Sequence, residues 1–478
     1  MNSSSRISSK GRPGCCRDRR RPPGHSLMKN LDCLFVYSGC RTGKKITLPI
    51  MPAGLLALAG YLEKNGIGSG IISLPGADRG EFKTADIIRE RRVKLVCIPV
   101  HWHQQTGSAL RLAKKIKREN RGIMIAVGGF TASYFAGEIL GKFKEVDFVI
   151  RGDAEIPLLK LLRRLKRGAT DFGGIGNLAW RGKNGVVLNG MGYSAGPAML
   201  AGLDLTGLKF VLNRNAAPYR GVCFEDGMFT YVHGRGCADN CPACGGGRAF
   251  QKNINGRSGV AVKDPVSTAD DFEKLAAMGI TAIQLPLSPE PGDAYYVELF
   301  KRLLVKKLKP VLKVEMCGLP SKKLLSWFGR ALAPGSNLTI FAGSGSEKVR
   351  RRNRGRFYTN EQLVGILRHA AGMGINIWTG FTTGLPFETR GDFLLTAALM
   401  RRIKRLFKTD RTGVYVFPLE PGSPLFENPR KYGVTLRRTT LEDFIAQDGQ
   451  YDMGYSTEHF TESEIVRNLK SLESCSRE

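Results

Sequence analysis

Short, almost continuously apolar segments alternate with amphipathic helical patterns over two long parts of this chain. In the first part, apolar segments at residues 31–37, 67–74, 95–100, 123–127 and 146–150 alternate with helical patterns at residues 52–66, 87–92, 107–117 and 156–165. Strands that are apolar on both faces are typical of a parallel sheet covered by helices on both sides. We therefore expect residues 29–170 to form a Rossmann-like, doubly wound parallel α/β domain.

The second part repeats this alternation after residue 226. Strand patterns occur at residues 228–232, 283–287, 311–315, 338–341, 375–381 and 414–417, and helical patterns at residues 272–278, 295–305, 324–332, 360–373 and 393–407. This order predicts a partial or full β/α (TIM-like) barrel over residues 226–425, with its chemistry at the carboxyl ends of the strands.

The remaining segments connect or flank these two units. Residues 1–28 read as a disordered basic tail, because residues 1–27 hold seven Lys or Arg against one Asp and no apolar core of a secretory signal. Residues 171–225 are predicted to be a linker with a small hairpin, in which Asn184-Gly185 supplies the turn. Residues 426–478 are expected to be a C-terminal cap or extension.

Composition indicates a globular protein without a membrane span, but it leaves the kind of binding partner open. The chain has 478 residues, 42% of them hydrophobic, and no apolar run is long enough to span a membrane. A net charge of +31 keeps RNA or DNA open as a partner. The charge is spread over helical patterns, however, and no aromatic-rich basic module accompanies it, so a small-molecule or metabolite substrate is favoured over nucleic acid.

Three of the eleven cysteines, Cys237, Cys241 and Cys244, form a CxxxCxxC motif that is followed at once by three glycines. This spacing suits a loop that binds three corners of a cubane iron–sulfur cluster and leaves the fourth iron without a protein ligand. A zinc site, a disulfide pair or chance remain as alternatives, with His233 as the nearest further zinc ligand. The other cysteines are scattered, which favours a reducing, cytoplasmic location.

Several ordered blocks beyond the cysteines resemble the radical SAM superfamily. The blocks that carry the resemblance are Ser344–Arg350 with Tyr358-Thr359, Gly374–Asn376, Gly384–Thr389 and Glu420–Pro424, in addition to the cysteine motif. The first block follows the fourth predicted strand, Gly374–Asn376 opens the fifth, Gly384–Thr389 follows the fifth and Glu420–Pro424 follows the sixth. Together they cover about residues 229–424. The resemblance implies a 4Fe-4S cluster held by the three cysteines, with S-adenosylmethionine (SAM) on the open iron.

The segment before the barrel resembles the cobalamin-binding domain that precedes many radical SAM barrels. The matching features are Pro52–Leu56 with Leu62, Gly128-Gly129, and Val146-Asp147 followed by Gly152–Glu155. The chain has no DxHxxG signature, in which a histidine replaces the lower axial ligand of cobalt. Such a signature is also absent from many of the radical SAM relatives, so the resemblance implies that cobalamin is a third cofactor.

The resemblance also implies which residues contact the cofactors. For SAM, the candidates are Gly245, Gly246, Glu290, Glu315, Ser344 and Ser346. Ala243 stands where relatives often have an aromatic residue, and Gly343 stands where they often have Glu. Glu290 is at best a stand-in for a glycine-glycine-glutamate motif.

The candidates for cobalamin follow the carboxyl ends of the predicted strands, where ligands bind in open α/β sheets. They are His101, His103, Gly128, Gly129, Gly152 and Glu155, with Trp102 and Tyr134 as further walls of the pocket. Each glycine also has an ordinary explanation as a tight turn, and Glu155 as a charge at a helix start.

The implied reaction is reductive cleavage of SAM to a 5′-deoxyadenosyl radical, with an electron donor such as flavodoxin or ferredoxin. A corrinoid in front of the barrel favours methylation of an unactivated carbon. Cyclisation, rearrangement or oxidation by the same cofactors is the nearest alternative, followed by RNA modification and by a corrinoid-binding sensor. No catalytic side chain is assigned from the sequence.

Overall fold

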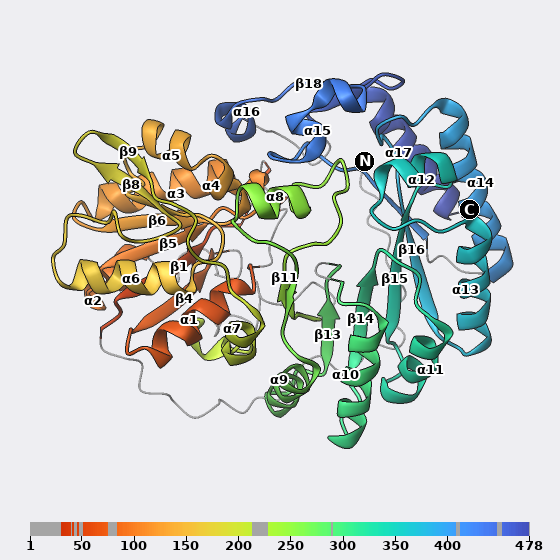
Figure 1. Cartoon of the computed structure of the whole chain (residues 1–478), viewed down its shortest axis with the longest axis horizontal. Coiled ribbons are helices and arrows are strands. Elements are labelled where there is room, and N and C mark those ends of the chain that lie inside the picture. Colours follow the sequence, from red (N-terminus) through yellow and green to blue (C-terminus); the bar gives the residue numbers. More distant parts are fainter. Residues whose placement is uncertain are drawn as a thin grey trace.

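The computed structural model describes residues 30–39, 41–42, 45–46, 51–74, 84–212, 228–287, 290–407, 412–446 and 452–477. Two sheets with their covering helices lie next to each other in these residues (Figure 1). The predicted basic tail at residues 1–28 lies outside the described residues. None of the described helices is both long and apolar enough to cross a membrane.

The first sheet has seven strands in the order β4-β1-β5-β6-β7-β8-β9. The first five run parallel, and β8 and β9 are antiparallel additions at one edge. The strands are β1 (Cys33–Tyr37), β4 (Ser69–Ser73), β5 (Leu95–Pro99), β6 (Met124–Gly128), β7 (Phe148–Ile150), β8 (Leu178–Gly182) and β9 (Gly185–Leu188). The predicted hairpin is therefore part of this sheet rather than of a separate linker, and its pairing with β7 buries Leu178 and Ala179.

Helices cover both faces of the first sheet, as the apolar strands predict. Alternate residues of β1 belong to different cores: Phe35 packs with α1 (Gly54–Lys64) and α6 (Glu155–Lys166), and Leu34 and Val36 pack with the opposite helices. Those opposite helices are α2 (Thr84–Glu90), α3 (Thr106–Glu119), α4 (Phe130–Tyr134) and α5 (Ala136–Lys142). In chain order the parallel strands run 2-1-3-4-5, which places a crevice at the carboxyl ends of β1 and β5.

The second sheet has six parallel strands in chain order. They are β10 (Phe229–Thr230), β13 (Ala282–Leu285), β14 (Val311–Met316), β15 (Asn337–Gly343), β16 (Asn376–Thr382) and β17 (Thr412–Tyr415). In the described residues β10 and β17 form the two edges and do not pair, so the sheet does not close on itself. All six predicted strands are present in the predicted order.

Helices follow these strands and pack against the outer face of the sheet. They are α9 (Pro265–Ala277), α10 (Asp293–Val305), α11 (Lys322–Ala331), α12 (Glu347–Asn353), α13 (Asn360–Gly372) and α14 (Arg390–Phe407). N-cap residues set where three of these helices begin. The side chains of Asp264, Ser321 and Thr359 accept hydrogen bonds from backbone amides of the first turns of α9, α11 and α13.

The C-terminal segment contacts both units. It contains α15 (Pro424–Glu427), β18 (Val434–Leu436), α16 (Leu441–Ile445), β19 (Tyr455–Thr457) and α17 (Glu462–Arg477). Phe444 packs against His103 and Phe135 of the first unit, and the Tyr455 hydroxyl donates a 3.0 Å hydrogen bond to the Gly384 carbonyl of the second. The segment from residue 424 onward thus packs over one side of both units (Figure 1).

The smaller elements lie between or beside the sheets. They are the ribbons β2 (Arg41–Thr42) with β3 (Lys45–Ile46) and β11 (Gly234–Arg235) with β12 (Ala261–Val262), and the short helices α7 (Pro197–Gly202) and α8 (Arg248–Asn253). The ribbon of β11 and β12 and helix α8 flank the cysteine motif on either side. Sequence reasoning did not predict them, because two-residue strands and one-turn helices leave little periodic signal.

Candidate active site

One cavity of about 1420 Å³ opens between the two units. The first unit lines it with residues at or just beyond the ends of β5, β6 and β7, among them His101, Gly129 and Gly152. The second unit lines it with residues of all six strands or of the loops that follow them. The carboxyl ends of both sheets therefore face a common space, as expected for ligand sites in parallel α/β folds.

The cysteine motif lies in the wall of this cavity. Cys237, Cys241 and Cys244 all line it, and the Cys244 amide donates a 3.1 Å hydrogen bond to the Cys241 carbonyl in a tight turn. Gly236, with φ of +90°, lets the chain leave β11, since a Cβ atom there would lie 2.4 Å from the Gly259 carbonyl oxygen. The sequence thus brings three thiols to one surface of the cavity.

The geometry argues against a single metal ion at this loop. Among the described residues, no group of three or more His, Cys, Asp or Glu side chains is arranged to hold one ion. His233, the nearest zinc ligand by sequence, is fully buried and stacks on Tyr295 with 5.4 Å between ring centroids. A cubane cluster requires a different arrangement, because each thiolate binds a different iron. Three thiols that all line one large cavity are compatible with that requirement.

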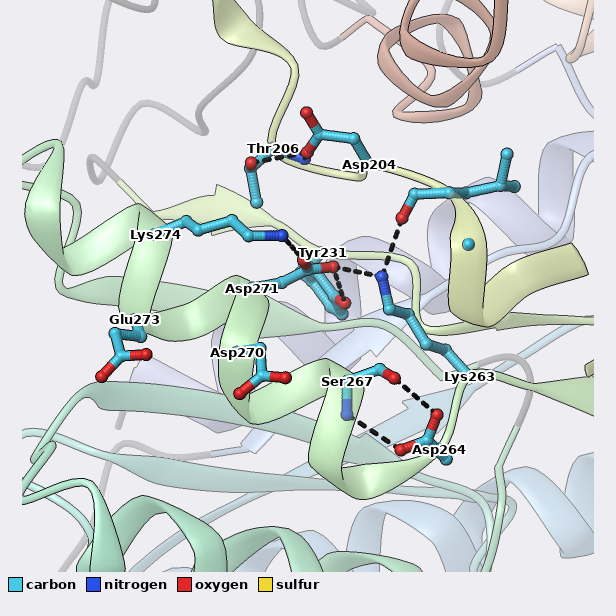
Figure 2. Close-up of polar contacts among 12 residues, drawn as sticks. Asp204, Thr206, Tyr231, Lys263, Asp264, Ser267, Asp270, Asp271, Glu273 and Lys274 are labelled. Atoms are coloured by element: carbon cyan, nitrogen blue, oxygen red, sulfur yellow. Dashed lines mark hydrogen bonds and ion pairs between the residues drawn. The ribbon is translucent and has the colours of Figure 1, made fainter. Parts of the chain in front are cut away.

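A buried ion pair anchors the strand that leads into the cysteine loop (Figure 2). The Tyr231 hydroxyl donates a 2.8 Å hydrogen bond to Oδ2 of Asp271, and Nζ of Lys263 donates to the same oxygen at 2.5 Å. Lys263 also donates to the Leu203 carbonyl at 2.8 Å. Lys263 and Asp271 are 2% and 1% exposed. These contacts fix the base of the loop against α9 and against the segment that follows the first sheet.

The glycines after the third cysteine are explained by packing. A Cβ atom on Gly245 would lie 2.7 Å from Oε2 of Glu420, and one on Gly246 would lie 3.0 Å from the Phe130 ring. The Gly245 amide donates a 2.8 Å hydrogen bond to Glu420, a half-buried residue whose pKa is raised by desolvation and only partly lowered again by this bond. Contacts of Gly245 and Gly246 with SAM stay a prediction, although both residues line the cavity.

Glu290 and Glu315, predicted to contact SAM, also line the cavity. Glu290 accepts hydrogen bonds from the Cys317 and Gly318 amides and pairs with Arg356 at 2.9 Å. Glu315 accepts from Gln284 at 2.6 Å and from an amide of the β13 loop. Burial raises the pKa of both carboxyl groups, and their hydrogen bonds and neighbouring cations oppose this effect.

Ser344 and Ser346, the other predicted SAM contacts, do not line the cavity. Both are buried, and the Ser346 hydroxyl donates to Asp392 at 2.6 Å while accepting from an amide of the first turn of α12. The Ser344 hydroxyl lies 3.2 Å from that of Thr396. The arrangement gives these serines a structural role in joining the β15 loop to α12 and α14.

The two histidines predicted beside the corrinoid lie at the edge of the cavity. His101 packs on Phe130 with 4.4 Å between ring centroids, and its backbone is fixed by a hydrogen bond to Gln105. His103 is 2% exposed, packs against Phe444, and has no hydrogen-bond partner on either ring nitrogen within the described structure. Burial lowers the pKa of His101 to about 4 and that of His103 to about 3, so both rings are neutral near pH 7.

The predicted cobalamin glycines lie where backbones approach closely. Gly129, with φ of +109°, passes His101 so tightly that a Cβ atom would lie 2.8 Å from the His101 Cα atom, and Gly128 lies against Ile150. Gly152 instead faces the second unit, since its Cβ atom would lie 2.7 Å from the Asn255 carbonyl oxygen. The three glycines line the cavity, but only Gly128 and Gly129 shape its wall within the first sheet.

Glu155 belongs to an ion-pair network that joins the units. Arg235, two residues before Cys237, pairs with Glu155 and, at 2.8 Å, with Asp153. Arg257 pairs with Asp153 as well. Burial raises the pKa of Asp153, but the two arginines more than offset this and leave it lowered, while the two carboxylates raise the pKa of Arg235 despite burial. The cysteine loop is therefore tied electrostatically to the end of β7.

Sequence reasoning missed Cys317, Glu420 and Arg235 as residues of the site. Cys317 adds a fourth thiol to the cavity wall at the end of β14, with Nη1 of Arg354 3.9 Å from its sulfur. Its position directly after an apolar strand was a usable signal, since strand ends line such sites. Glu420 opens the Glu420–Pro424 block that carries part of the resemblance, but it was given no role, and Arg235 gave no comparable signal because its partners are distant in the sequence.

Comparison with known proteins assigns a family to part of the first unit and shows which solved structures share the fold of the chain. Residues 42–162 match the family model described as the B12 binding domain. No curated protein sequence matches the chain.

Among solved structures, the chain is similar to the radical S-adenosylmethionine methyltransferase TsrM from Kitasatospora setae with cobalamin and a [4Fe-4S] cluster bound, with a TM-score of 0.67, 17% identity, and coverage of 93% of this chain and 89% of that one. It is also similar to the cobalamin-dependent S-adenosylmethionine radical enzyme OxsB with aqua-cobalamin bound, with a TM-score of 0.64, 15% identity, and coverage of 93% and 66%.

Proposed function

We propose that this chain, which carries a B12-binding domain and has the fold of cobalamin-dependent radical SAM enzymes, is a cobalamin-dependent radical SAM methyltransferase. In this proposal the second sheet is a partial β/α barrel, and the substrate is a small molecule whose unactivated carbon receives the methyl group. A low-potential protein such as flavodoxin or ferredoxin would supply the electron. TsrM, one of the similar structures, is itself described as a methyltransferase.

The observation that carries the proposal is that one cavity serves both units. The three cysteines line the same cavity as the residues that follow β5 and β6 in the first unit. The cysteine loop also touches the first unit directly, since Gly246 lies against Phe130. A group carried by the first unit and a substrate held by the second would therefore meet without crossing solvent.

The residues present fit the three implied cofactors. Cys237, Cys241 and Cys244 would hold the cluster, the wall near Glu290 and Glu315 would hold SAM, and the crevice beside His101 would hold the corrinoid. When bound, the cluster supplies an electron, SAM supplies a methyl group and a radical precursor, and the corrinoid carries the methyl group.

The chain itself orients the two units relative to each other and encloses the cavity between them. The network of Arg235 and Arg257 with Asp153 and Glu155 holds the two units in register, and the C-terminal segment packs over both. Burial in such a site excludes water from reactive intermediates. The mainly apolar lining from Leu55, Phe130 and Phe417 serves the same end.

The test uses protein reconstituted anaerobically with iron, sulfide and hydroxocobalamin, then incubated with methyl-labelled SAM, a reductant and extract of the source cells. We expect about four irons and one corrinoid per chain, and transfer of label to a small molecule identified by mass spectrometry. Replacement of the three loop cysteines by Ala should abolish iron binding and labelling. Cys33→Ala, in the core of the first sheet, should retain both. SAM cleavage without labelled product would contradict methyl transfer, and labelled RNA would point to a nucleic-acid substrate.

A further inference from the structure

Lys313 lies on the cavity face of β14, and within the described residues no close ion pair neutralises its charge. It lines the cavity, and its Nζ atom has no hydrogen-bond partner within the described residues. The nearest carboxylate belongs to Glu315, two residues along the same strand, and its Oε1 atom lies 3.9 Å from Nζ of Lys313. Glu315 already accepts hydrogen bonds from Gln284 and from the Leu287 amide. A cation in a cavity with so weak a partner can bind an anion of a ligand.

Lys313 belongs to a polar row that crosses four neighbouring strands. The strand register pairs Thr230 with Gln284, Gln284 with Lys313, and Lys313 with Asn337. Because paired residues of parallel neighbours project to the same face, the whole row faces the cavity side of the sheet. It lies deeper than the cysteine loop, about four residues or roughly 13 Å of strand below Cys317.

Several polar atoms of this face are buried without a partner in the described structure. They are Oγ1 of Thr230, Oδ1 of Asn337 and Oγ1 of Thr339, the last on a residue that is only 1% exposed. Thr339 pairs in register with Glu315 and so sits one layer above Lys313. An unpaired buried hydroxyl costs about 1–3 kcal/mol, so these groups are expected to bond to a ligand or to water. Of these three residues Thr230 lines the cavity together with Lys313, and its hydroxyl can donate to a carboxylate.

An aromatic wall stands above the polar row. Phe341, Trp378 and Tyr415 contact one another with ring centroids 5.6–6.4 Å apart, and Tyr415 remains 41% exposed while lining the cavity. Glycines make room for the rings: a Cβ atom on Gly380 would lie 2.8 Å from Phe341, and one on Gly413 would lie 2.1 Å from Trp378. Such a wall favours a flat, apolar body through stacking.

We propose that the substrate is an aromatic or similarly flat carboxylic acid, whose carboxylate pairs with Lys313 and whose ring packs on Phe341 and Tyr415. A phosphate ester fits less well, because a dianion beside a single lysine would lie close to the Glu315 carboxylate. The carboxylate anchors the far end of the substrate, and the carbon that reacts lies nearer the cysteine loop. This assignment deepens the proposed function and rests on it.

The test measures binding of three matched probes, 3-phenylpropionate, 3-phenylpropionamide and 3-phenylpropylamine, to protein loaded with cluster and hydroxocobalamin. Saturation-transfer NMR titrations give the three dissociation constants without any turnover. We expect the acid to bind at least ten-fold more tightly than the amide or the amine. Lys313→Met should remove this preference and leave amide binding unchanged, whereas Lys313→Arg should keep most of it. Lys309→Met, at an exposed lysine just before β14, should keep all of it.

Three results would overturn the assignment: no binding of the acid, equal or better binding of the amide or amine, or a preference for the acid that survives Lys313→Met. Iron and cobalt contents of each variant show that the site has assembled. Because the measurement needs neither SAM cleavage nor methyl transfer, its failure is distinguishable from failure of the proposed reaction.

Discussion

The Gly245 amide donates a 2.8 Å hydrogen bond to Oε2 of Glu420, and this bond joins the cysteine loop to the turn after β17. The two residues are 175 positions apart. Glu420 is half-buried, desolvation raises its pKa, and a Cβ atom on Gly245 would lie against the same carboxylate oxygen. This bond and the 3.0 Å hydrogen bond from the Leu425 amide to the Pro242 carbonyl together hold the loop against the segment after β17.

Removal of this acceptor should weaken the retention of iron. Glu420→Ala leaves a buried amide without a partner, at a cost of about 1–3 kcal/mol to the local structure. We expect faster loss of iron from the reconstituted protein when a chelator is added, followed by absorbance. Glu420→Gln keeps an oxygen acceptor and should lose iron at nearly the wild-type rate. If both variants lose iron at the wild-type rate, the bond does not position the loop.

The pairing of Arg235 with Asp153 and Glu155 should couple the stabilities of the two units. Arg235→Met removes the cation that pairs with the buried Glu155 and leaves Asp153 with Arg257 alone, and the loss of one partner from a buried pair costs about 3–5 kcal/mol. We expect a lower urea midpoint at pH 7 and separate unfolding transitions for the two units. Arg402→Met, which breaks an exposed pair with Glu361, should change the midpoint little.

The same variant has a defined pH dependence. The folded pKa of Asp153 is lowered, so its stabilising contribution is present above the unfolded value of about 4 and is lost as the pH falls through the folded value. The difference between wild type and Arg235→Met should therefore shrink between pH 7 and pH 3. A constant difference over this range would show that the ion pairs are not its cause.

The sequence predicted the strands of both parallel sheets, but not the long-range contacts that assemble them. Alternation and apolar runs are local signals, so all strands of the two parallel sheets were found. The pairing of β8 with β7 is not local, and the hairpin was therefore assigned to a linker. Ser346 shows a competing local signal: a serine followed by Glu347 and an apolar residue also marks a helix start, and in the structure its hydroxyl caps α12.

The Lys263–Asp271 pair should matter far more than its exposed neighbour on the same carboxylate (Figure 2). Lys263→Met leaves Asp271 buried with only Tyr231 and Lys274 as partners, which should cost about 3 kcal/mol. Lys274 is 57% exposed, so Lys274→Met should cost about 0–1 kcal/mol. Urea unfolding of both variants gives the comparison, and equal losses would contradict the role assigned to burial.

His233 should make the folded protein sensitive to acid. Its ring is buried and its pKa is lowered from 6.5 to about 4, so the unfolded chain binds a proton between these values more readily than the folded chain. The stability that depends on a neutral ring is present above about pH 6.5 and falls as the pH drops toward 4, by about 3 kcal/mol over the full range. His233→Phe should therefore resemble wild type at pH 8 and become progressively more stable than wild type toward pH 4 in urea midpoint measurements. Tyr295→Phe, which keeps the ring that stacks on His233, should leave the wild-type slope intact. If His233→Phe and wild type keep the same difference at pH 8 and pH 4, the buried imidazole does not cause the acid sensitivity.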